Sequence, residues 1–273
     1  MSKLIVSFNG TKYTEDLEKY IFLLNPYGLI FFTKNIETGS QLKALVSSIK
    51  ENFPSLKLAV DMEGGLVNRF RKIEGDLPLP SKPVHFREFG KKIGFILKNY
   101  NFDIDFAPVV DIDRGVRGNG LDGRYLGKSA EEVIEKAGYF LEGLESEGVQ
   151  GCLKHYVGLS YARTDSHFGL PEIERIEEDD ELPFKALSTS LRLVMAAHIK
   201  VKDYGISTFS EKFVKRIKAF HKGHLICDDL GMKALGNLSL KEKLTKTLDA
   251  GFDLAIITDM ITPFNPHDIS SFS

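Results

Sequence analysis

The sequence predicts an α/β protein in which eight parallel strands and their helices close into a (β/α)₈ barrel. Short apolar runs alternate with longer amphipathic segments, and this alternation is typical of a parallel sheet. There are eight such runs, the number of strands that closes a barrel of this type. The rival architecture, an open doubly wound sheet, favours a glycine fingerprint after its first strand. The segment FNGTKYT, which follows the first run here, has no such fingerprint.

The predicted strands are short runs of apolar residues, as expected for strands that are buried on both faces. In chain order they are Leu4–Phe8, Gly28–Phe32, Leu56–Val60, Phe102–Val109, Val149–Leu153, the run LVMAA around Val194, His224–Cys227 and Asp253–Ile257.

Helices are predicted between most of these strands, for example over residues 39–53, 129–148 and 239–251. In the second of these segments, apolar residues recur at steps of three and four, which marks one face of a helix. Ser129 followed by Glu132 predicts a capping box at its start, and Gly148 predicts its end.

Only sixteen residues follow Ile257, too few for a full eighth helix and its connection. We therefore expect a shortened or missing last helix. A short turn, the N-terminal segment or a second subunit then covers that part of the barrel. Residues 1–273 are expected to form a single domain.

Composition excludes several classes of protein. The net charge of −2 and the absence of a basic stripe argue against binding to nucleic acid. No apolar run is long enough to span a membrane, and the first run is too short for a signal peptide. Cys152 and Cys227 lie in apolar runs and are predicted to be buried thiols. We expect a cytoplasmic protein that is a monomer or a weak homodimer.

Charged residues follow six of the predicted strands, where a barrel of this type carries its active site. They are Asp61 and Glu63, Asp111 and Asp113, Lys154 and His155, His198, Asp228 and Asp229, and Asp259. Aspartate is also common in turns, so one such position proves little. Six strands with the same feature predict a polar pocket on an apolar barrel.

A carboxylate and a group that titrates near neutral pH are what glycoside hydrolysis needs. Asp228, at the end of the seventh strand, suits the role of nucleophile. His167 suits the role of acid/base if Asp165, two positions earlier, holds its ring in one tautomer. The alternative is that Asp165 and His167 form a plain polar turn.

Several segments carry a resemblance to a known family, among them AVDMEGGLVNRF, LKHYVGLSYARTDSH and LICDDLGMKA. In combination, order and spacing they resemble glycoside hydrolase family 3, and within it the single-domain bacterial β-N-acetylglucosaminidases. The resemblance runs almost from end to end of the chain.

By position, the resemblance implies that Asp228 is the nucleophile, His167 the acid/base and Asp165 the partner of His167. It also implies residues that grip the hydroxyl and acetamido groups of the sugar, namely Asp61, Arg69, Arg124, Lys154 and His155. A retaining reaction through a covalent glycosyl–enzyme intermediate follows, with no cofactor and no metal.

The chain departs from the family pattern in three places, one of which is the segment before the seventh strand, FVKRIKAFHKGH, which is shorter than usual. The segment KHYVGLS carries Val157, Leu159 and Ser160 where the family usually has proline, histidine and glycine. Leu66 follows the EGG motif, where arginine is usual. These changes concern substrate choice and loop motion.

Three functions compete at this point. The first is a retaining exo-β-N-acetylglucosaminidase that processes cell-wall fragments. The second is a phosphorylase, because a histidine that has given up its proton is neutral and does not repel phosphate. The third is a sugar-binding barrel that has lost turnover through its altered loop.

Overall fold

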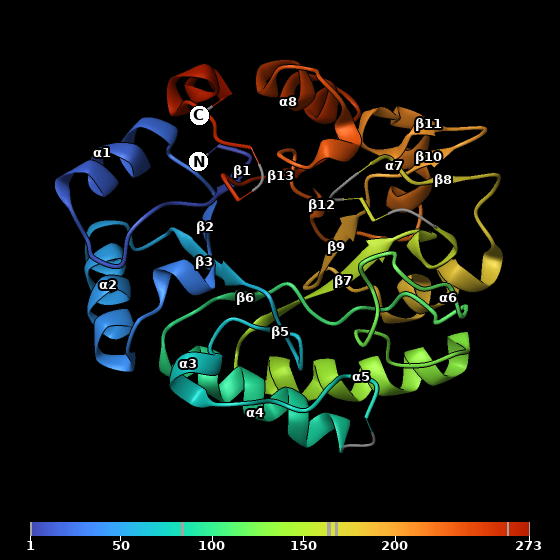
Figure 1. The fold of residues 1–273 in the computed structure, drawn as a ribbon, viewed down its shortest axis with the longest axis horizontal. Coiled ribbons are helices and arrows are strands. Elements are labelled where there is room, and N and C mark those ends of the chain that lie inside the picture. Colours follow the sequence, from blue (N-terminus) through green and yellow to red (C-terminus); the bar gives the residue numbers. More distant parts are fainter. Residues whose placement is uncertain (1, 83–84, 163–164, 167–168, 261, 273) are drawn as a thin grey trace.

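The computed structural model describes residues 2–82, 85–162, 165–166, 169–260 and 262–272, and it contains a closed parallel barrel surrounded by helices (Figure 1). Around the barrel the strands follow the order β1, β13, β12, β9, β7, β6, β3, β2. The predicted (β/α)₈ fold is confirmed. The barrel strands are β1 (Leu4–Val6), β2 (Gly28–Phe31), β3 (Lys57–Val60), β6 (Ile104–Asp105), β7 (Gln150–Tyr156), β9 (Leu193–Ala196), β12 (Leu225–Cys227) and β13 (Leu254–Ile257).

Helices pack around the outside of the barrel, and α4 and α5 lie side by side along one edge of it (Figure 1). The helices are α1 (Glu15–Leu24), α2 (Gly39–Asn52), α3 (Arg71–Glu74), α4 (Phe86–Asn99), α5 (Ala130–Ser146), α6 (Glu178–Leu187), α7 (Glu211–Lys218) and α8 (Leu240–Asp249). Several begin at a residue whose hydroxyl accepts a hydrogen bond from the first turn, which satisfies an otherwise unpaired N–H. These capping residues are Thr14, Thr38, Ser129, Ser210 and Ser239.

The start of α5 differs in one respect from the predicted capping box. The Ser129 hydroxyl accepts from the Glu132 N–H at 3.2 Å, as expected. The Glu132 carboxylate, however, accepts from the N–H of Lys128 at 2.7 Å and also pairs with Lys136. The prediction is therefore half right, because two other donors occupy the glutamate. Gly148 follows the end of the helix with a φ of +79°, a conformation that favours glycine.

Most strands end within two residues of the predicted position, but the carboxyl ends of two strands differ by three or four residues. The fourth strand was predicted to reach Val109, but regular pairing in β6 ends at Asp105, shortly before Pro108. Proline has no N–H to donate to a ladder, so the pairing beyond it is irregular. The fifth strand was predicted to end at Leu153, but β7 continues to Tyr156. Lys154 and His155 therefore lie inside a strand, which holds their backbone in place.

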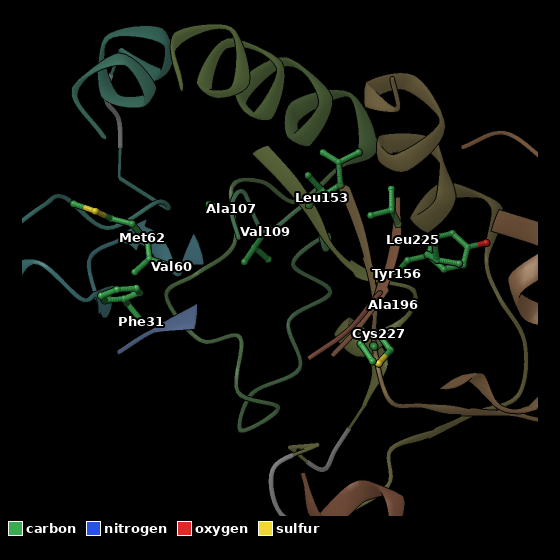
Figure 2. Close-up of a cluster of buried hydrophobic side chains, with 14 of the residues drawn as sticks. Phe31, Val60, Met62, Ala107, Val109, Leu153, Tyr156, Ala196, Leu225 and Cys227 are labelled. Carbon is green, nitrogen blue, oxygen red and sulfur yellow. The ribbon is translucent and has the colours of Figure 1, made fainter. Parts of the chain in front are cut away.

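Alternate residues of the barrel strands enter two separate apolar cores. Side chains such as Ile5, Ile30 and Met195 fill the inside of the barrel. Their neighbours in sequence pack outward against the helices, and Figure 2 shows part of this outer layer, including Leu153 and Cys227. Cys152 belongs to the inner core and Cys227 to the outer one, and both are buried free thiols, as predicted.

Two small sheets outside the barrel were not predicted, because strands of two or three residues carry no readable period. The hairpin of β4 (Met62–Gly64) and β5 (Val67–Asn68) follows β3 directly. A three-stranded sheet joins β8 (Glu172–Ile173), β10 (Lys200–Val201) and β11 (Gly205–Ile206). Both sheets belong to connections that leave the carboxyl ends of barrel strands.

The barrel closes where β1 pairs with β13, with Leu4 opposite Ala255. After β13, the last barrel strand, the described chain forms two short 3₁₀ turns, Pro266–Asp268 and Ser270–Phe272. They take the place of the full helix that would follow this strand in a complete (β/α)₈ barrel. These turns pack near α1 (Figure 1). The expected shortened last helix is confirmed for the described residues. None of the described helices combines the length and the apolar character needed to cross a membrane.

Candidate active site

A cavity of about 490 Å³ opens at the carboxyl ends of the barrel strands. Its floor is the top layer of the inner core, with Ile30, Phe106, Met195 and Ile256 among the lining residues. Seven of the eight residues predicted for the site line this cavity: Asp61, Arg69, Arg124, Lys154, His155, Asp165 and Asp228. The eighth, His167, lies outside the described residues.

One side of the cavity is built on ion pairs around Glu63. The Glu63 carboxylate accepts two hydrogen bonds from the Arg124 guanidinium, at 2.8 and 2.7 Å. Lys154 Nζ lies 2.6 Å from the same carboxylate and 2.8 Å from Asp61 Oδ1. Glu63 and Lys154 are almost fully buried. Such buried charges are stable only as a mutually satisfied set.

The pKa values in this network reflect the balance between burial and charge. Burial alone would raise the pKa of Glu63, but Arg124 and Lys154 outweigh it and hold that pKa well below its ordinary value. Burial alone would lower the pKa of Lys154, but Asp61 and Glu63 raise it above its ordinary value. Glu63, Lys154 and Arg124 therefore stay ionised at neutral pH.

His155 is fixed by Asp111. Asp111 Oδ2 lies 2.9 Å from His155 Nδ1 and also accepts from the His155 backbone N–H at 2.8 Å. His155 Nε2 faces Arg124 Nη2 at 3.4 Å. Since arginine can only donate, Nε2 is the acceptor in this contact and Nδ1 is the donor toward Asp111. The Asp111 contact thus selects the tautomer of this ring.

Asp228 and Asp229 follow β12 on another side of the cavity. Asp228 Oδ1 accepts from the Asp229 backbone N–H at 2.8 Å, which orients the Asp228 carboxylate. The Asp229 carboxylate accepts from the N–H groups of Gly231 and Thr258, each at 2.9 Å, and from the Thr258 hydroxyl. The Asp229 carboxylate thus ties the chain after β12 to the chain after β13.

Burial raises the pKa of Asp229 to about 6, and the nearby charge of Asp228 adds to this shift. The hydrogen bonds from Thr258 and Gly231 oppose the shift without cancelling it. Asp229 thus changes its charge close to neutral pH, next to the predicted nucleophile.

Asp165 reaches the cavity beside the loop that follows β6. Gly120 on that loop has a φ of +82°, and a Cβ there would lie only 2.9 Å from Asp165 Oδ2. Glycine at this position is what allows the Asp165 carboxylate to approach the loop. The glycine-rich loop of residues 115–123 thus contributes to the cavity wall.

The two arginines predicted for the site differ in how far their donors are occupied. Arg124 donates to both Glu63 oxygens and to the Gly120 carbonyl at 2.8 Å. Arg69 stacks over Phe32 and approaches Asp61 only to 3.8 Å. Its buried Nε has no hydrogen-bond partner among the described residues. The Arg69 side chain is 30% exposed and lines the cavity, whereas Arg124 is occupied in holding the site together.

Glu63 and Asp111 are central to the site, although the sequence analysis noted them only as strand-end acids. Asp61 and Lys154 drew attention because they fit a family motif. Nothing in the local sequence distinguishes a carboxylate that faces a buried lysine from one in an ordinary turn. His198, left out of the predicted catalytic set, is buried, with its ring nitrogens 2.6 Å from the Thr208 hydroxyl and 2.9 Å from the Asp229 carbonyl.

Comparison with known proteins identifies the family. The model of the glycosyl hydrolase family 3 N-terminal domain matches residues 4–264. The chain belongs to this family. As a family 3 member it is a glycoside hydrolase, and the resemblance read from the sequence motifs is confirmed.

Relatives within family 3 match most of the chain. A β-hexosaminidase of Neisseria meningitidis is 33% identical over 267 residues, which cover 86% of this chain and 72% of the relative. The crystal structure of native NagZ from Neisseria gonorrhoeae superposes with a TM-score of 0.84 at 27% identity, covering 99% of this chain and 88% of that one. NagZ from the same organism in complex with N-trifluoroacetyl-D-glucosamine gives a TM-score of 0.83 at 26% identity, with the same coverage.

Proposed function

We propose that this family 3 protein is a retaining exo-β-N-acetylglucosaminidase that removes terminal β-linked N-acetylglucosamine in a single barrel domain. The observation that carries the proposal is the single cavity that Asp228 shares with Asp61, Arg69 and Lys154. Relatives named β-hexosaminidase and NagZ support the activity, and one NagZ structure holds an N-acylated glucosamine.

In the first step, an oxygen of Asp228 attacks the anomeric carbon while the bond to the leaving oxygen breaks. His167 gives its proton to that oxygen. In the second step, His167 takes a proton from water, and the water oxygen displaces Asp228 from the anomeric carbon. Two inversions give net retention. The hydrogen bond from the Asp229 N–H to Asp228 keeps the attacking carboxylate in one orientation.

The position of Asp165 supports a loop-borne acid/base. Asp165 lines the cavity two residues before His167. An acid this close along the chain can hold the imidazole in one tautomer, as a triad aspartate does. Proton transfer of this kind contributes about 10²–10⁴ in rate.

The donors around the cavity fit a sugar rich in oxygen atoms. Arg69 lines the cavity, and its side chain is 30% exposed. Lys154 uses two of its three protons on Asp61 and Glu63. Asp61 offers acceptor oxygens to hydroxyl groups. In this proposal Arg69, Lys154, Asp61 and His155 bind the sugar, and Arg124 holds Glu63 in place.

The natural substrates we propose are cell-wall fragments that carry terminal N-acetylglucosamine, met in the cytoplasm. Two buried thiols without a disulfide fit a reducing compartment. The oligomeric state proposed is a monomer or a weak homodimer.

The test uses aryl and alkyl β-N-acetylglucosaminides with the wild type and the variant Asp228→Asn. Turnover should fall by about 10⁴-fold or more, because the nucleophile is lost. Asp203→Asn, at an exposed aspartate outside the cavity, is the matched control and should turn over normally. Undiminished turnover in Asp228→Asn contradicts the mechanism.

Two further readouts separate the alternatives. His167→Ala should lose about 10²–10⁴ in rate on alkyl glycosides and recover on aryl glycosides with good leaving groups. Product analysis with and without phosphate distinguishes free sugar from sugar 1-phosphate, the product of a phosphorylase. Binding without any turnover in the wild type indicates a sugar-binding barrel.

A further inference from the structure

The mouth of the active-site cavity has an apolar side that the proposed reaction does not yet use. Leu66 and Met260 are large apolar residues that remain 65% and 51% exposed, and both line the cavity. Phe32, half-buried, lines it as well. Exposed apolar side chains that gather at a cavity mark a binding surface more often than scattered ones do.

Met260 lies in the turn that follows β13, which ends at Ile257. Ile256, Thr258 and Met260 all line the cavity, so this part of the chain follows the cavity wall. Ile256 is 2% exposed, Thr258 3% and Met260 51%. From Ile256 to Met260 the chain therefore runs from the apolar floor of the cavity to its mouth. Between the two it passes a layer of polar residues that includes Asp229 and Thr258, which we call the polar level.

The chains that follow β2 and β3 also run from the floor of the cavity to its mouth. Ile30 belongs to the floor and Phe32, two residues later, is partly exposed. After β3, Asp61 and Glu63 lie at the polar level, and Leu66 follows in the turn of the hairpin. These three chains leave strands β3, β2 and β13, which are separated only by β1 in the order of the barrel. Leu66, Phe32 and Met260 therefore belong to one sector of the mouth, which we name the apolar rim.

The opposite sector is polar at its exposed positions. Among the cavity-lining residues that follow β6 and β7, Asp122 and Asp165 are exposed or partly exposed, whereas Leu121 and Leu159 are buried. The sugar whose bond is cleaved must lie at the polar level, where Asp228 and Lys154 are. The group attached to it points outward, because an exo-acting site is closed below by the apolar floor.

We infer that the apolar rim of Leu66, Phe32 and Met260 is a subsite for the leaving group, and that the preferred leaving group presents an apolar face to it. This inference rests on the proposed function, since a leaving group exists only if the cavity cleaves a glycoside. The inference adds the chemical class of the leaving group. A leaving group with an apolar ring or carbon chain fits the rim better than a charged leaving group.

The test compares methyl, butyl and hexyl β-N-acetylglucosaminides, whose leaving alcohols have similar acidity and differ in apolar size. Each fully buried methylene gains about 4-fold in affinity, so a partly covered butyl group should raise kcat/KM about 10-fold over methyl. Leu66→Lys and Met260→Lys should each flatten this rise, so that the ratio of kcat/KM between the butyl and methyl glycosides falls toward 1. Leu66→Met, which keeps an apolar side chain at this position, should keep the rise of kcat/KM from methyl to butyl.

Leu191→Lys is the matched control, because Leu191 is 77% exposed and lies just before β9, at the other end of the barrel. This variant should keep the full rise from methyl to butyl. A wild-type kcat/KM that is flat or falls with chain length overturns the inference, as does a rise that survives both rim substitutions.

Calorimetric binding of the same series to Asp228→Asn keeps the two proposals apart. Tighter binding with chain length supports the apolar rim even if no glycoside is hydrolysed, in which case only the proposed function fails. Hydrolysis together with chain-length-independent binding means that the function stands and the rim does not contact the leaving group.

Discussion

The two sides of the cavity hold their carboxylates by different means. On the side of β3 and β7, Glu63 and Asp61 are paired with Arg124 and Lys154. On the side of β12, Asp229 is held by N–H groups and a hydroxyl, all of them neutral donors. Cations keep a buried carboxylate ionised, whereas neutral donors leave it able to take up a proton. The site thus combines a frame of fixed charge with a carboxylate that titrates beside Asp228.

The largest expected effect comes from removing the cation of the fixed frame. Lys154→Met keeps the length of the side chain but leaves Asp61 and Glu63 with less compensation. Breaking a buried pair in this way costs about 3–5 kcal/mol of unfolding free energy. Urea unfolding monitored by circular dichroism measures it.

Lys57→Met is the control for this experiment. Lys57 is 44% exposed and lies 3.4 Å from Asp103, which Lys50 also bonds. Its loss should cost less than about 1 kcal/mol. Equal losses in the two variants would mean that the buried frame has no special role in stability.

The second effect concerns the titrating side. The pKa of Asp229 is about 6 in the fold, above the ordinary value near 3.9 of an unfolded chain. The folded state therefore favours protonated Asp229, and the wild type loses stability as the pH rises from about 4 to above 6. Relative to Asp229→Asn, which does not titrate, this loss should reach about 3 kcal/mol. Urea unfolding of both proteins at several pH values tests it, and a pH-independent difference between them would contradict it.

The smallest effect concerns Arg69, whose side chain is 30% exposed in the cavity wall. Arg69→Lys replaces the planar guanidinium by an ammonium with fewer donors but leaves Asp61 bonded to Lys154. KM should rise about 10-fold, close to the value of one hydrogen bond to a ligand, while the unfolding free energy stays constant. Steady-state kinetics and unfolding measured on the same preparation separate the two quantities. A stability loss with unchanged KM would assign Arg69 to the frame.

The barrel was predictable because the buried strands appear in the sequence as continuous apolar runs. The helices appear as segments with apolar residues on one face. The positions of Asp61, Lys154 and Asp228 at one rim followed from the same reasoning. What the sequence did not reveal depends on contacts between distant segments. The pairing of Glu63 with Arg124, 61 residues later, leaves no local pattern. The extension of β7 to Tyr156 depends on its neighbour β9, which pairs with it as far as Ala196.

The pairing of β1 with β13 joins the first and last strands of the sheet and closes the barrel. Leu4 and Ala255 are neighbours in this ladder, and Asp259 accepts a hydrogen bond from the Ser7 hydroxyl at 2.6 Å. During synthesis, β1 can pair with β13 only after all the strands between them have been made. Because this contact joins residues far apart in sequence, we expect the barrel to close slowly and late in folding. Conversely, a circularly permuted gene that links the two ends and opens the chain at an outer helix connection keeps all eight ladders intact.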